Sequence, residues 1–462
     1  MKISSESQGK RTRRQARRAA VEALQSFVKQ APRRVPRRLT ALSLFSGGGV
    51  GDLGYAASGF SFKVHAEIDK RRAAVCARNF PKSAIVVGDL RKCWHEVVRR
   101  YQVTSTRPLD LLVVTPPCQG MSSSNPSRGK VTDADSGNRR AKERNLLILP
   151  VAKIIRQLQP RIVVIENVPQ FLARLVRVKR NSEPVNVVRL FMRRIRGYAS
   201  YRTVVQMADF GIPQARRRSV IVLVRKDDKC FEFLRKRRVL PWPRATYSED
   251  SREGKHKWLT VSEWLRAMRY PPLDASNQEK AQHPSTPLHR VPAYGQTRYS
   301  WIAHIPPNSG ANAYQNSTCL DCHSNSIAVN RAHCHHCGAP MRHRPHVKRR
   351  NGRIRLIRGF QSSYRRMRPD RPAPTITTAS SHLGSDYTIH PWENRVLSAL
   401  ECADLQTVPR TYDWSAALDN GLNYMVRKIV GEAMPPWFTY LHGQVLASIV
   451  RRRTTEAAAR AN

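Results

Sequence analysis

The chain has 462 residues, a length that predicts two or three domains. It carries 81 Lys and Arg against 33 Asp and Glu, a formal net charge of +48, and its 40% share of hydrophobic residues excludes disorder over the whole chain. We find no run of about 18 apolar residues and no secretory leader, so we expect no membrane contact and a cytoplasmic location, on the nucleoid in a prokaryote. The positive charge favours nucleic acid as the partner, because each neutralised phosphate releases condensed counterions.

Residues 1–38 hold twelve Lys and Arg against two Glu. We expect a disordered basic arm that attracts phosphate, in which residues 17–29 form at most a short helix before Pro32 and Pro36 end it. An organelle transit peptide is the alternative that an Arg-rich, acid-poor N-terminus leaves open.

Six short apolar runs, each followed by a turn and a helix-like stretch, lie between residues 39 and 225. Such runs are typical of parallel strands buried on both faces. They predict an α/β domain over residues 39–225 with a doubly wound, mostly parallel sheet, whose ligands bind at the carboxyl ends of the strands. The predicted strands are residues 42–45, 64–68, 85–87, 109–114, 162–165 and 220–224.

The first three predicted strands end in residues that suit an adenosine-containing cofactor. Residues 46–52 form a glycine-rich turn, which lets backbone N–H groups approach a ligand closely, although a plain tight turn has the same composition. Glu67 closes the second strand, where a carboxylate can accept both ribose hydroxyls, and Asp89 closes the third, where it can accept from an adenine amine. No Gly-Lys-Ser/Thr follows the glycines, which disfavours a phosphate-binding loop.

The later strand ends supply groups for covalent chemistry. Cys118 follows two prolines at the rim of the sheet; a lone Cys is usually a small buried hydrophobe, but this position suits a nucleophile. Glu166 ends the fifth strand, where partial desolvation would raise its pKa and make it a proton donor; a capping carboxylate is the simpler alternative. Arg216 and Arg218 precede the last strand and suit a DNA phosphate or a base carbonyl.

The order of these motifs resembles the cytosine-C5 DNA methyltransferase family. Residues 44–54 resemble its S-adenosylmethionine loop, and Glu67 and Asp89 match its contacts to the ribose and the adenine of that cofactor. Pro117-Cys118-Gln119 matches the nucleophile motif, Glu166-Asn167-Val168 the acid motif and Gln214-x-Arg216-x-Arg218 the arginine motif. Residues 371–378 and 390–406 resemble the segment before the final motif, which itself appears as residues 431–436.

The resemblance implies a DNA (cytosine-5-)-methyltransferase that acts on a flipped cytosine. The Cys118 thiolate would add to C6 while Glu166 hydrogen-bonds or protonates N3 and Arg218 steadies the base carbonyl, so that C5 attacks the methyl group of S-adenosylmethionine. Arg216 belongs to the same catalytic set, and residues 122–138 have the composition of a mobile loop that closes on DNA. The cofactor pocket would be formed by Phe45, Ser46, Gly47, Gly49, Glu67, Ile68, Asp89, Leu90 and Pro117.

Two places depart from the family's pattern. Val50 and Gly51 look exchanged in the glycine loop, and Glu432 stands where the final motif normally carries Asn. A carboxylate at position 432 would alter packing near the nucleophile loop or the cofactor pocket. Neither departure removes a member of the Cys118, Glu166 and Arg218 set, so we expect an active enzyme.

Four cysteines form two Cys-x2-Cys knuckles eleven residues apart, at Cys319, Cys322, Cys334 and Cys337. Four thiolates suit a tetrahedral structural zinc ion. Redox or disulfide pairing is the alternative, although nine cysteines and no export signal disfavour a disulfide framework. Neighbouring histidines could replace a thiolate ligand; they are His323, His333, His335 and His336.

Residues 226–375 lose the α/β pattern and are rich in Arg, His and aromatic side chains. In the resembling family this region recognises the target sequence, so we expect a target-recognition domain that carries the zinc module at 319–337 and docks on double-stranded DNA. Residues 376–462 would return to the catalytic domain. We expect a monomer, either solitary or paired with a restriction or defence component.

Two alternatives remain at the level of the sequence. The first is an RNA cytosine-C5 methyltransferase, which the long zinc-bearing region disfavours. The second is a catalytically inactive DNA-binding homologue, which Glu432 mildly favours and the intact Cys118, Glu166 and Arg218 disfavour.

Overall fold

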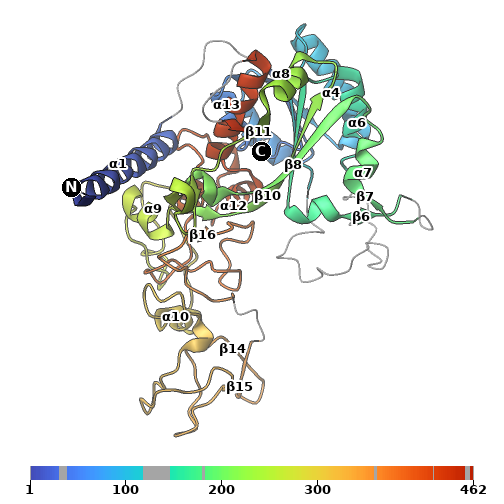
Figure 1. Cartoon of the computed structure of the whole chain (residues 1–462). Helices are drawn as coiled ribbons and strands as arrows, with labels where there is room; N and C mark the ends of the chain where they lie inside the picture. The colour runs from blue at the N-terminus through green and yellow to red at the C-terminus, as the bar shows by residue number, and fades with distance from the viewer. Residues whose placement is uncertain are drawn as a thin grey trace.

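The computed structural model describes residues 2–30, 39–117, 146–178, 183–357, 362–419, 421–452 and 458–460. Figure 1 shows a central sheet flanked by helices and an elongated lobe that extends away from one end of it. The N-terminal helix projects from the region where the two parts join (Figure 1).

Seven strands form the central sheet in the order β3-β2-β1-β4-β5-β10-β8. Strands β1 to β5 run parallel to their neighbours among themselves, and β10 is antiparallel to both β5 and β8. This confirms the predicted mostly parallel α/β sheet. The strand order reverses between β1 and β4, and such a reversal leaves a crevice at the carboxyl ends of the two strands. The strands are β1 (Leu39–Leu44), β2 (Phe60–Glu67), β3 (Ala84–Val87), β4 (Leu111–Val114), β5 (Ile162–Asn167), β8 (Tyr198–Gln206) and β10 (Arg217–Arg225).

The apolar runs do not predict β8. Most of its residues stay partly exposed, because it lies at the edge of the sheet. The inner strands β1, β4 and β5 are buried along their whole length. The apolar runs therefore mark the inner strands and the short edge strand β3, and they miss the longer edge strand β8.

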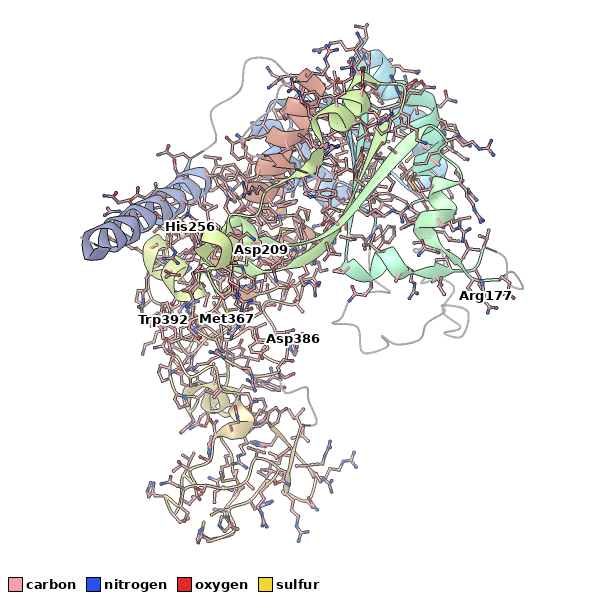
Figure 2. The ribbon with its side chains drawn as sticks, viewed as in Figure 1. Arg177, Asp209, His256, Met367, Asp386 and Trp392 are labelled. Atoms are coloured by element: carbon pink, nitrogen blue, oxygen red, sulfur yellow. The ribbon has the colours of Figure 1, made fainter. Side chains whose placement is uncertain are left out.

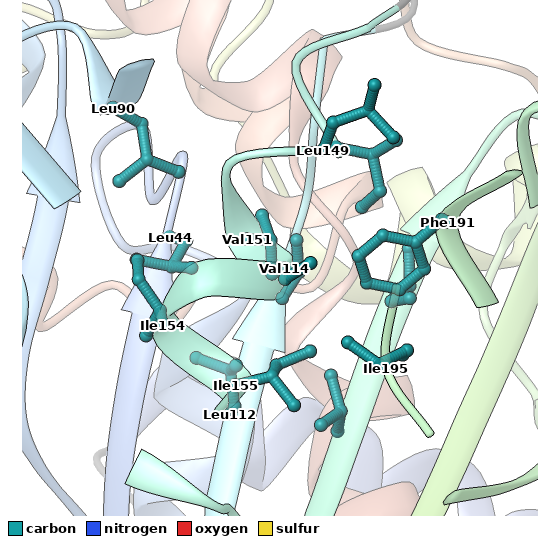
Figure 3. Packing of buried hydrophobic residues seen from close by; sticks show 14 of the residues in the cluster. Leu44, Leu90, Leu112, Val114, Leu149, Val151, Ile154, Ile155, Phe191 and Ile195 are labelled. Carbon is teal, nitrogen blue, oxygen red and sulfur yellow. The ribbon is translucent and has the colours of Figure 1, made fainter. Parts of the chain in front are cut away.

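A separate hydrophobic core covers each face of the sheet, because successive residues of a strand point to opposite faces. On one face Leu44 and Val114 pack against Leu90, Ile154 and Phe191 (Figure 3). On the other face Ala41 and Val113 pack with residues of the last long helix. The helices are α1 (Lys2–Lys29), α2 (Asp52–Ala57), α3 (Lys70–Asn79), α4 (Leu90–Thr104), α6 (Val151–Leu158), α7 (Val187–Met192), α8 (Lys229–Arg237), α9 (Val261–Met268), α10 (Gln296–Ala303), α11 (Ala399–Leu405), α12 (Tyr424–Glu432) and α13 (Pro436–Arg451).

The last long helix, α13, brings the end of the chain back to the first motif. Phe438 and Val445 lie in the core of the sheet, far in sequence from β1. Gly54 in α2 makes this close packing possible, because a Cβ there would stand 2.1 Å from the carbonyl oxygen of Pro436 and 2.2 Å from Oγ1 of Thr439. The glycine loop and the final motif are thereby held together.

The N-terminal arm corrects our expectation. Residues 2–29 form one helix instead of a disordered arm, and residues 31–38 lie outside the described residues. Leu24 and Val28, one turn apart, are buried in a core shared with α9, α11 and α12, and Phe27 packs on Trp437 with ring centroids 5.2 Å apart. Arg17 pairs with Glu263 at 2.7 Å. The arm folds because the apolar side of its helix packs against α9, α11 and α12, a contact that the sequence alone does not predict.

No helix in the described part of the chain combines the length and the hydropathy that a membrane span needs.

Residues 226–375 do not form one separate body. Val239 packs in the core of the sheet, and Trp264 and Met268 pack with the helices that precede the final motif. An independent core begins near Leu273 and includes Trp301, and a small cluster surrounds the cysteines. The shorter strands are β6 (Leu175–Val176), β7 (Val185–Asn186), β9 (Gln214–Ala215), β11 (Val239–Pro243), β12 (Tyr247–Ser248), β13 (His256–Lys257), β14 (His346–Lys348), β15 (Ile354–Leu356), β16 (Ala373–Pro374) and β17 (Ala458–Arg460).

Candidate active site

A large cavity opens at the carboxyl ends of the parallel strands and has a volume of about 1430 Å³. Its walls come from the glycine loop, from the ends of β2 to β5, and from the final motif. It extends to the junction with the lobe, where Asp386 lies (Figure 2). The motifs that are scattered along the sequence therefore share one cavity.

The glycine loop follows β1 in a strained conformation. Phe45 has a φ of 58°, which is unusual for a residue with a side chain, and Gly47 has a φ of 55°. A Cβ at Gly47 would meet no atom within 4 Å, so the backbone there is open to a ligand. Behind the loop, the Tyr412 hydroxyl donates to the carbonyl of Gly48, and a Cβ at Gly48 would stand 2.8 Å from that hydroxyl. The loop thus presents one open face to the cavity, and its other face packs against Tyr412, in the C-terminal part of the chain that returns to the catalytic domain.

The exchange of Val50 and Gly51 is accommodated by the fold. Val50 is buried in the core beneath the loop, and Gly51 has an ordinary helical φ of −63°. A Cβ at Gly51 would lie 3.4 Å from Cβ of Met434, which is ordinary contact. The departure therefore adds an apolar contact and leaves the open side of the loop unchanged.

Glu67 anchors the loop at the cavity wall. Its Oε2 accepts from the backbone N–H of Gly47 at 2.8 Å, and its Oε1 accepts from the N–H groups of Ile68 and Asp69 at 2.9 Å. A carboxylate oxygen has more than one lone pair, so these bonds leave capacity for ribose hydroxyls. Ile68 beside it lines the cavity with 65% of its surface exposed, an apolar face that suits an adenine ring.

Asp89 and Leu90 line the same cavity at the start of α4. The Asp89 carboxylate caps the helix by accepting from the N–H of Arg91 at 2.9 Å, and it pairs with the Arg91 side chain at 2.6 Å. These hydrogen bonds hold the pKa of Asp89 below its usual range. The side chain is therefore ionised and already has partners, a situation that the sequence motif did not reveal.

The turn after β4 leads to Cys118, the predicted nucleophile. Cys118 and the stretch 122–138 lie outside the described residues, while Thr115, Pro116 and Pro117 line the cavity. Nδ2 of Asn167 donates to the carbonyl of Pro116 at 3.0 Å, and Oγ1 of Thr115 donates to the carbonyl of Phe45 at 2.9 Å. The turn is therefore tied both to the strand that carries the acid motif and to the glycine loop.

Glu166 and Arg218 stand side by side in the cavity wall. Nε of Arg218 lies 2.9 Å from Oε1 of Glu166, with side-chain exposures of 12% and 10%. They come from β5 and β10, where Glu166 pairs with Val220 in the antiparallel register. Burial raises the pKa of Glu166 above its usual value, and the opposing effects of Arg218 and Arg216 do not cancel that rise. A carboxyl group whose pKa is raised by burial can hold a proton nearer neutral pH, even beside a cation that opposes the rise.

Arg216 lies apart from this pair. It is fully buried, and it donates to the carbonyl of Ile376 at 3.1 Å and to the carbonyl of Gly431 at 2.9 Å. Among the described residues that line the cavity, Arg217 and Arg218 appear and Arg216 does not. These contacts give Arg216 a supporting position between two segments of the return chain, in place of the direct catalytic contact expected from the arginine motif.

Sequence reasoning identified Glu432 but missed its partner. Arg72, near the start of α3, lines the cavity together with Glu432 and forms an ion pair with it. Arg72 lies in the helix between β2 and β3 and Glu432 lies in the final motif, and nothing in the sequence links the two. The departure from the family's Asn is therefore matched by a cation across the same cavity.

The four predicted cysteines come together in the lobe. All four sulfur atoms lie within 4.8 Å of one another, and the Cys319–Cys337 and Cys322–Cys334 sulfur pairs are each 3.7 Å apart. A disulfide would need about 2.05 Å, so these sulfurs are not bonded. A tetrahedron of sulfurs at the usual Zn–S distance of about 2.3 Å has edges of about 3.8 Å, close to the spacing found. The group found among the described residues contains the four cysteines and none of the neighbouring histidines.

Comparison with known proteins identifies the family. A sequence model described as C-5 cytosine-specific DNA methylase matches residues 39–444. The chain belongs to this family. The Type II methyltransferase M1.HgaI of Avibacterium volantium is 27% identical over 412 residues, which cover 87% of this chain and 96% of that relative. The Type II methyltransferase M1.HphI of Haemophilus parahaemolyticus is 31% identical over 191 residues, which cover 41% of this chain and 46% of the relative.

Among solved structures, a prophage-encoded protein of E. coli described as a DNA modification methyltransferase superposes with a TM-score of 0.52 at 19% identity. The alignment covers 89% of this chain and 99% of that chain, which shows a shared fold. Family membership makes the chain an S-adenosylmethionine-dependent enzyme that methylates C5 of cytosine in DNA. It favours this activity over the RNA-modifying and inactive alternatives.

Proposed function

We propose that the enzyme methylates a flipped cytosine with Cys118 as nucleophile, Glu166 as the acid at N3 and Arg218 as the group that holds the base carbonyl. The observation that carries this proposal is the Glu166–Arg218 pair, buried at 2.9 Å in the wall of the cavity that Pro117 also lines. A carboxyl group with a raised pKa can donate to a ring nitrogen, and the guanidinium beside it can donate to the neighbouring carbonyl oxygen. Arg216 holds the segments of Ile376 and Gly431, which also line the cavity.

The chain's own residues account for the bond changes on the base and for the proton at N3. The Cys118 sulfur forms a bond to C6, and protonation or hydrogen bonding at N3 by Glu166 moves electron density to C5. S-adenosylmethionine, when bound, supplies the methyl group that C5 receives. S-adenosylhomocysteine is the leaving group. A water molecule then takes the C5 proton, and the electron pair of the C5–H bond restores the C5–C6 double bond. The S–C6 bond breaks to release the Cys118 thiolate, and the N3 proton returns to Glu166. The cytosine must leave the duplex to reach the cavity, as enzymes that act on a base require.

The residues present fit S-adenosylmethionine. The open face at Gly47 lets the ligand approach the backbone, the Glu67 carboxylate can accept the ribose hydroxyls, and Ile68 offers an apolar face to the adenine. The Asp89 carboxylate can accept from the adenine amine in exchange for one of the hydrogen bonds that it receives from Arg91. We assign the pocket to eight of the nine residues named from the sequence, to which Arg72 and Glu432 add a charged rim. Gly49 is not among the described residues that line the cavity: a Cβ there would stand 2.7 Å from the ring of Phe80, so its glycine serves the packing behind the loop.

We propose a restriction-modification setting and a monomeric enzyme. Its curated relatives include Type II methyltransferases of several bacteria. One copy of the chain carries every motif of the family in order, so a second copy is not needed to complete the site.

We further propose that the lobe recognises the target sequence and that its four cysteines hold a structural zinc ion. Four thiolates with sulfur spacings of 3.7 Å match a tetrahedral site with no open position, so the metal would stabilise the loops and take no part in the chemistry. Metal analysis of the purified protein tests this assignment. We expect about one zinc per chain, and its loss in the C319S/C334S variant.

A trapping experiment tests the catalytic proposal. The enzyme is incubated with labelled S-adenosylmethionine and DNA or RNA that contains 5-fluorocytosine, which has no C5 proton to lose. We expect a covalent adduct on DNA that disappears in the C118A variant and forms more slowly in E166Q. An adduct on RNA alone contradicts the DNA assignment, and no adduct on either polymer contradicts the catalytic proposal.

A further inference from the structure

The most basic stretch of the lobe lacks acidic residues altogether. Between Asp321 and Asp370 the sequence holds twelve Lys and Arg and no Asp or Glu. Five of the eight residues from 348 to 355 are basic. This segment includes strands β14 and β15, which form an antiparallel hairpin at the far end of the lobe from the central sheet (Figure 1).

The hairpin presents its charges to solvent. Lys348, Arg349, Arg350, Arg353 and Arg355 are all exposed, and none of them forms an ion pair with another described residue. The tight turn closes through a hydrogen bond from the N–H of Arg349 to the carbonyl of Arg353 at 2.8 Å. Such a concentration of unpaired cations on a small projection repels itself unless anions are near.

One face of the hairpin faces outward and the other faces the protein. Arg355 stands opposite the exposed Val347, and Arg353, two residues before it, shares their face. Ile354 and Leu356 alternate to the opposite face and are partly buried. Arg353 and Arg355 therefore lie on the outward face, and Ile354 and Leu356 attach the ribbon to the protein. Lys348 is exposed but pairs with Ile354 and shares the face of the apolar residues.

The base of the hairpin is joined to the cysteine module by Arg344, which is fully buried. Its Nε donates to the carbonyl of Asn316 at 2.8 Å. Its Nη2 donates to Ile327 at 2.6 Å, and its Nη1 donates to the carbonyls of Ala328 and Arg331 at 2.6 and 2.8 Å. The carbonyls of Ile327, Ala328 and Arg331 belong to the loop between the two cysteine knuckles, and that of Asn316 precedes the first knuckle. A guanidinium with four carbonyl partners couples the position of that loop to the strand that begins two residues later.

The other side of the base rests on the core of the lobe. The ring of His346 packs edge-on against Trp301 at 5.7 Å between centroids, and the N–H of Ile357 donates to the carbonyl of Pro345 at 2.9 Å. The base of the hairpin is thus held by two structures, while its tip is surrounded by solvent.

We propose that the β14–β15 hairpin is a phosphate-binding element that contacts duplex DNA away from the flipped base, and that the four-cysteine module holds it in place through Arg344. The inference rests on the proposed function for its DNA substrate and its metal. A two-stranded ribbon is narrow enough to lie along a B-DNA groove, and its outward arginines would contact the phosphates. This contact with phosphates does not depend on the DNA sequence. It adds affinity to any base-specific contacts that the rest of the lobe makes.

A charge-matched pair of variants tests the hairpin. R349Q/R350Q/R353Q removes three exposed cations from the hairpin turn, and the control R235Q/K236Q/R237Q removes three exposed cations from α8, at the opposite end of the molecule (Figure 1). Both are compared with the parent in binding 40-base-pair duplexes of random sequence, one of DNA and one of RNA, over a range of salt concentrations. We expect the hairpin variant to bind at least about tenfold more weakly in 0.1 M salt and to lose about 2.7 from the salt slope, at about 0.9 for each phosphate contact. Equal changes in both variants overturn the proposal, as does a loss confined to an RNA duplex.

A double-mutant cycle tests the anchoring role. C319S/C334S is expected to weaken DNA binding to about the level of the hairpin variant R349Q/R350Q/R353Q. The protein that combines all five substitutions is expected to bind DNA no more weakly than C319S/C334S or the hairpin variant alone. Additive losses overturn the anchoring role. Binding of S-adenosylhomocysteine serves as the check that the cysteine variant keeps its folded catalytic part. R344M is the second variant and should reproduce the loss while all four thiolates are retained.

These outcomes separate the inference from the proposed function. An enzyme that shows no 5-fluorocytosine adduct but whose hairpin variant still loses DNA affinity refutes the catalytic proposal alone. A protein that contains no zinc but shows the hairpin effect refutes the metal site alone. Methylation-sensitive sequencing of DNA modified by the hairpin variant should return the same target sequence at a lower level.

Discussion

Arg72 and Glu432, 360 residues apart, form a two-point ion pair at the edge of the cofactor cavity: Nη1 of Arg72 lies 2.6 Å from Oε2 and Nη2 lies 3.2 Å from Oε1 of Glu432. Burial alone would lower the pKa of Arg72, but Glu432 and the nearby Glu67 and Asp69 raise it. The pair joins α3, which follows Glu67, to the end of α12. A carboxylate at the family's Asn position is therefore a paired group that bridges two walls of the pocket.

The first prediction concerns this pair. E432A and R72A should each weaken the binding of S-adenosylhomocysteine by about three- to tenfold and raise KM for S-adenosylmethionine with little change in kcat, because the walls lose their link while the Cys118 set is intact. The double variant R72E/E432R should restore much of the affinity. The control is R78Q, which breaks the 2.9 Å Arg78–Asp413 pair between the same two parts of the chain, at an exposed place outside the cavity-lining residues described. An equal loss in R78Q would contradict a role at the pocket.

The second prediction concerns pH. Activity should fall on the alkaline side as Glu166 loses its proton, because the pKa of this carboxyl group is raised by burial and an ionised Glu166 cannot protonate N3. R218A removes the nearest opposing cation, so the pKa of Glu166 should rise further and the alkaline limb of kcat/KM should move to higher pH, with a rate loss of about a hundredfold or more. A pH–rate profile of both enzymes measures the shift. In E166Q the alkaline limb should vanish; its persistence would assign that limb to another group.

The same raised pKa predicts a small effect on stability. A folded-state pKa above the unfolded value contributes stability that is complete below the unfolded pKa and is lost as pH rises through the folded pKa. The free energy of unfolding of the parent should therefore decline across that range relative to E166Q. Denaturant unfolding at several pH values compares the two proteins. A parallel pH dependence in both would show that Glu166 does not titrate there.

The third prediction concerns the turn that carries the nucleophile. N167D keeps an oxygen to accept from the N–H of Val168 but loses the donor to the carbonyl of Pro116, so it should lower kcat by about ten- to a hundredfold. Binding of S-adenosylhomocysteine should change little. Loss of one buried hydrogen bond should cost about 1–3 kcal/mol in the free energy of unfolding. An N167D enzyme with the parent's kcat would show that this hydrogen bond does not position Cys118.

The fourth prediction separates Arg216 from Arg218. R216M should lower the free energy of unfolding by about 2–4 kcal/mol, because the buried carbonyls of Ile376 and Gly431 lose their donor. R218M should leave the free energy of unfolding nearly unchanged and reduce the rate of adduct formation with 5-fluorocytosine DNA. Thermal and denaturant unfolding measure the first effect, and the trapping assay measures the second. The reverse pattern would give Arg216 the direct contact with the base.

The fifth prediction revises the role of the N-terminal helix. Deletion of residues 1–14 removes five Lys and Arg and should weaken DNA binding and flatten its salt slope while Tm is unchanged. Deletion of residues 1–29 should also lower Tm, because it exposes the surface that Leu24, Phe27 and Val28 cover. The methylated sequence should be the same in both. A changed target sequence would show that the helix reads bases as well as phosphates.

The sequence by itself determined the local features of this protein. An inner strand must be apolar throughout, a turn that lets a ligand touch the backbone needs glycine, and paired cysteines two residues apart can share one metal. The apolar runs at residues 42–45, 64–68 and 109–114 could therefore be recognised directly, as could the cysteine knuckles. Each depends on residues that are neighbours in the chain.

The tertiary structure decided which distant residues meet. Arg72 pairs with Glu432, and Arg216 donates to the carbonyls of Ile376 and Gly431. Arg344 donates to carbonyls of the cysteine loop. Leu24 is buried, although the positive charge of its helix predicts a solvent-exposed arm. The net charge of +48 indicates a polyanion, but which cations are exposed and which are buried depends on how the chain packs. Pairing energy depends on distance and burial in three dimensions, and neither is encoded in the spacing of residues along the chain.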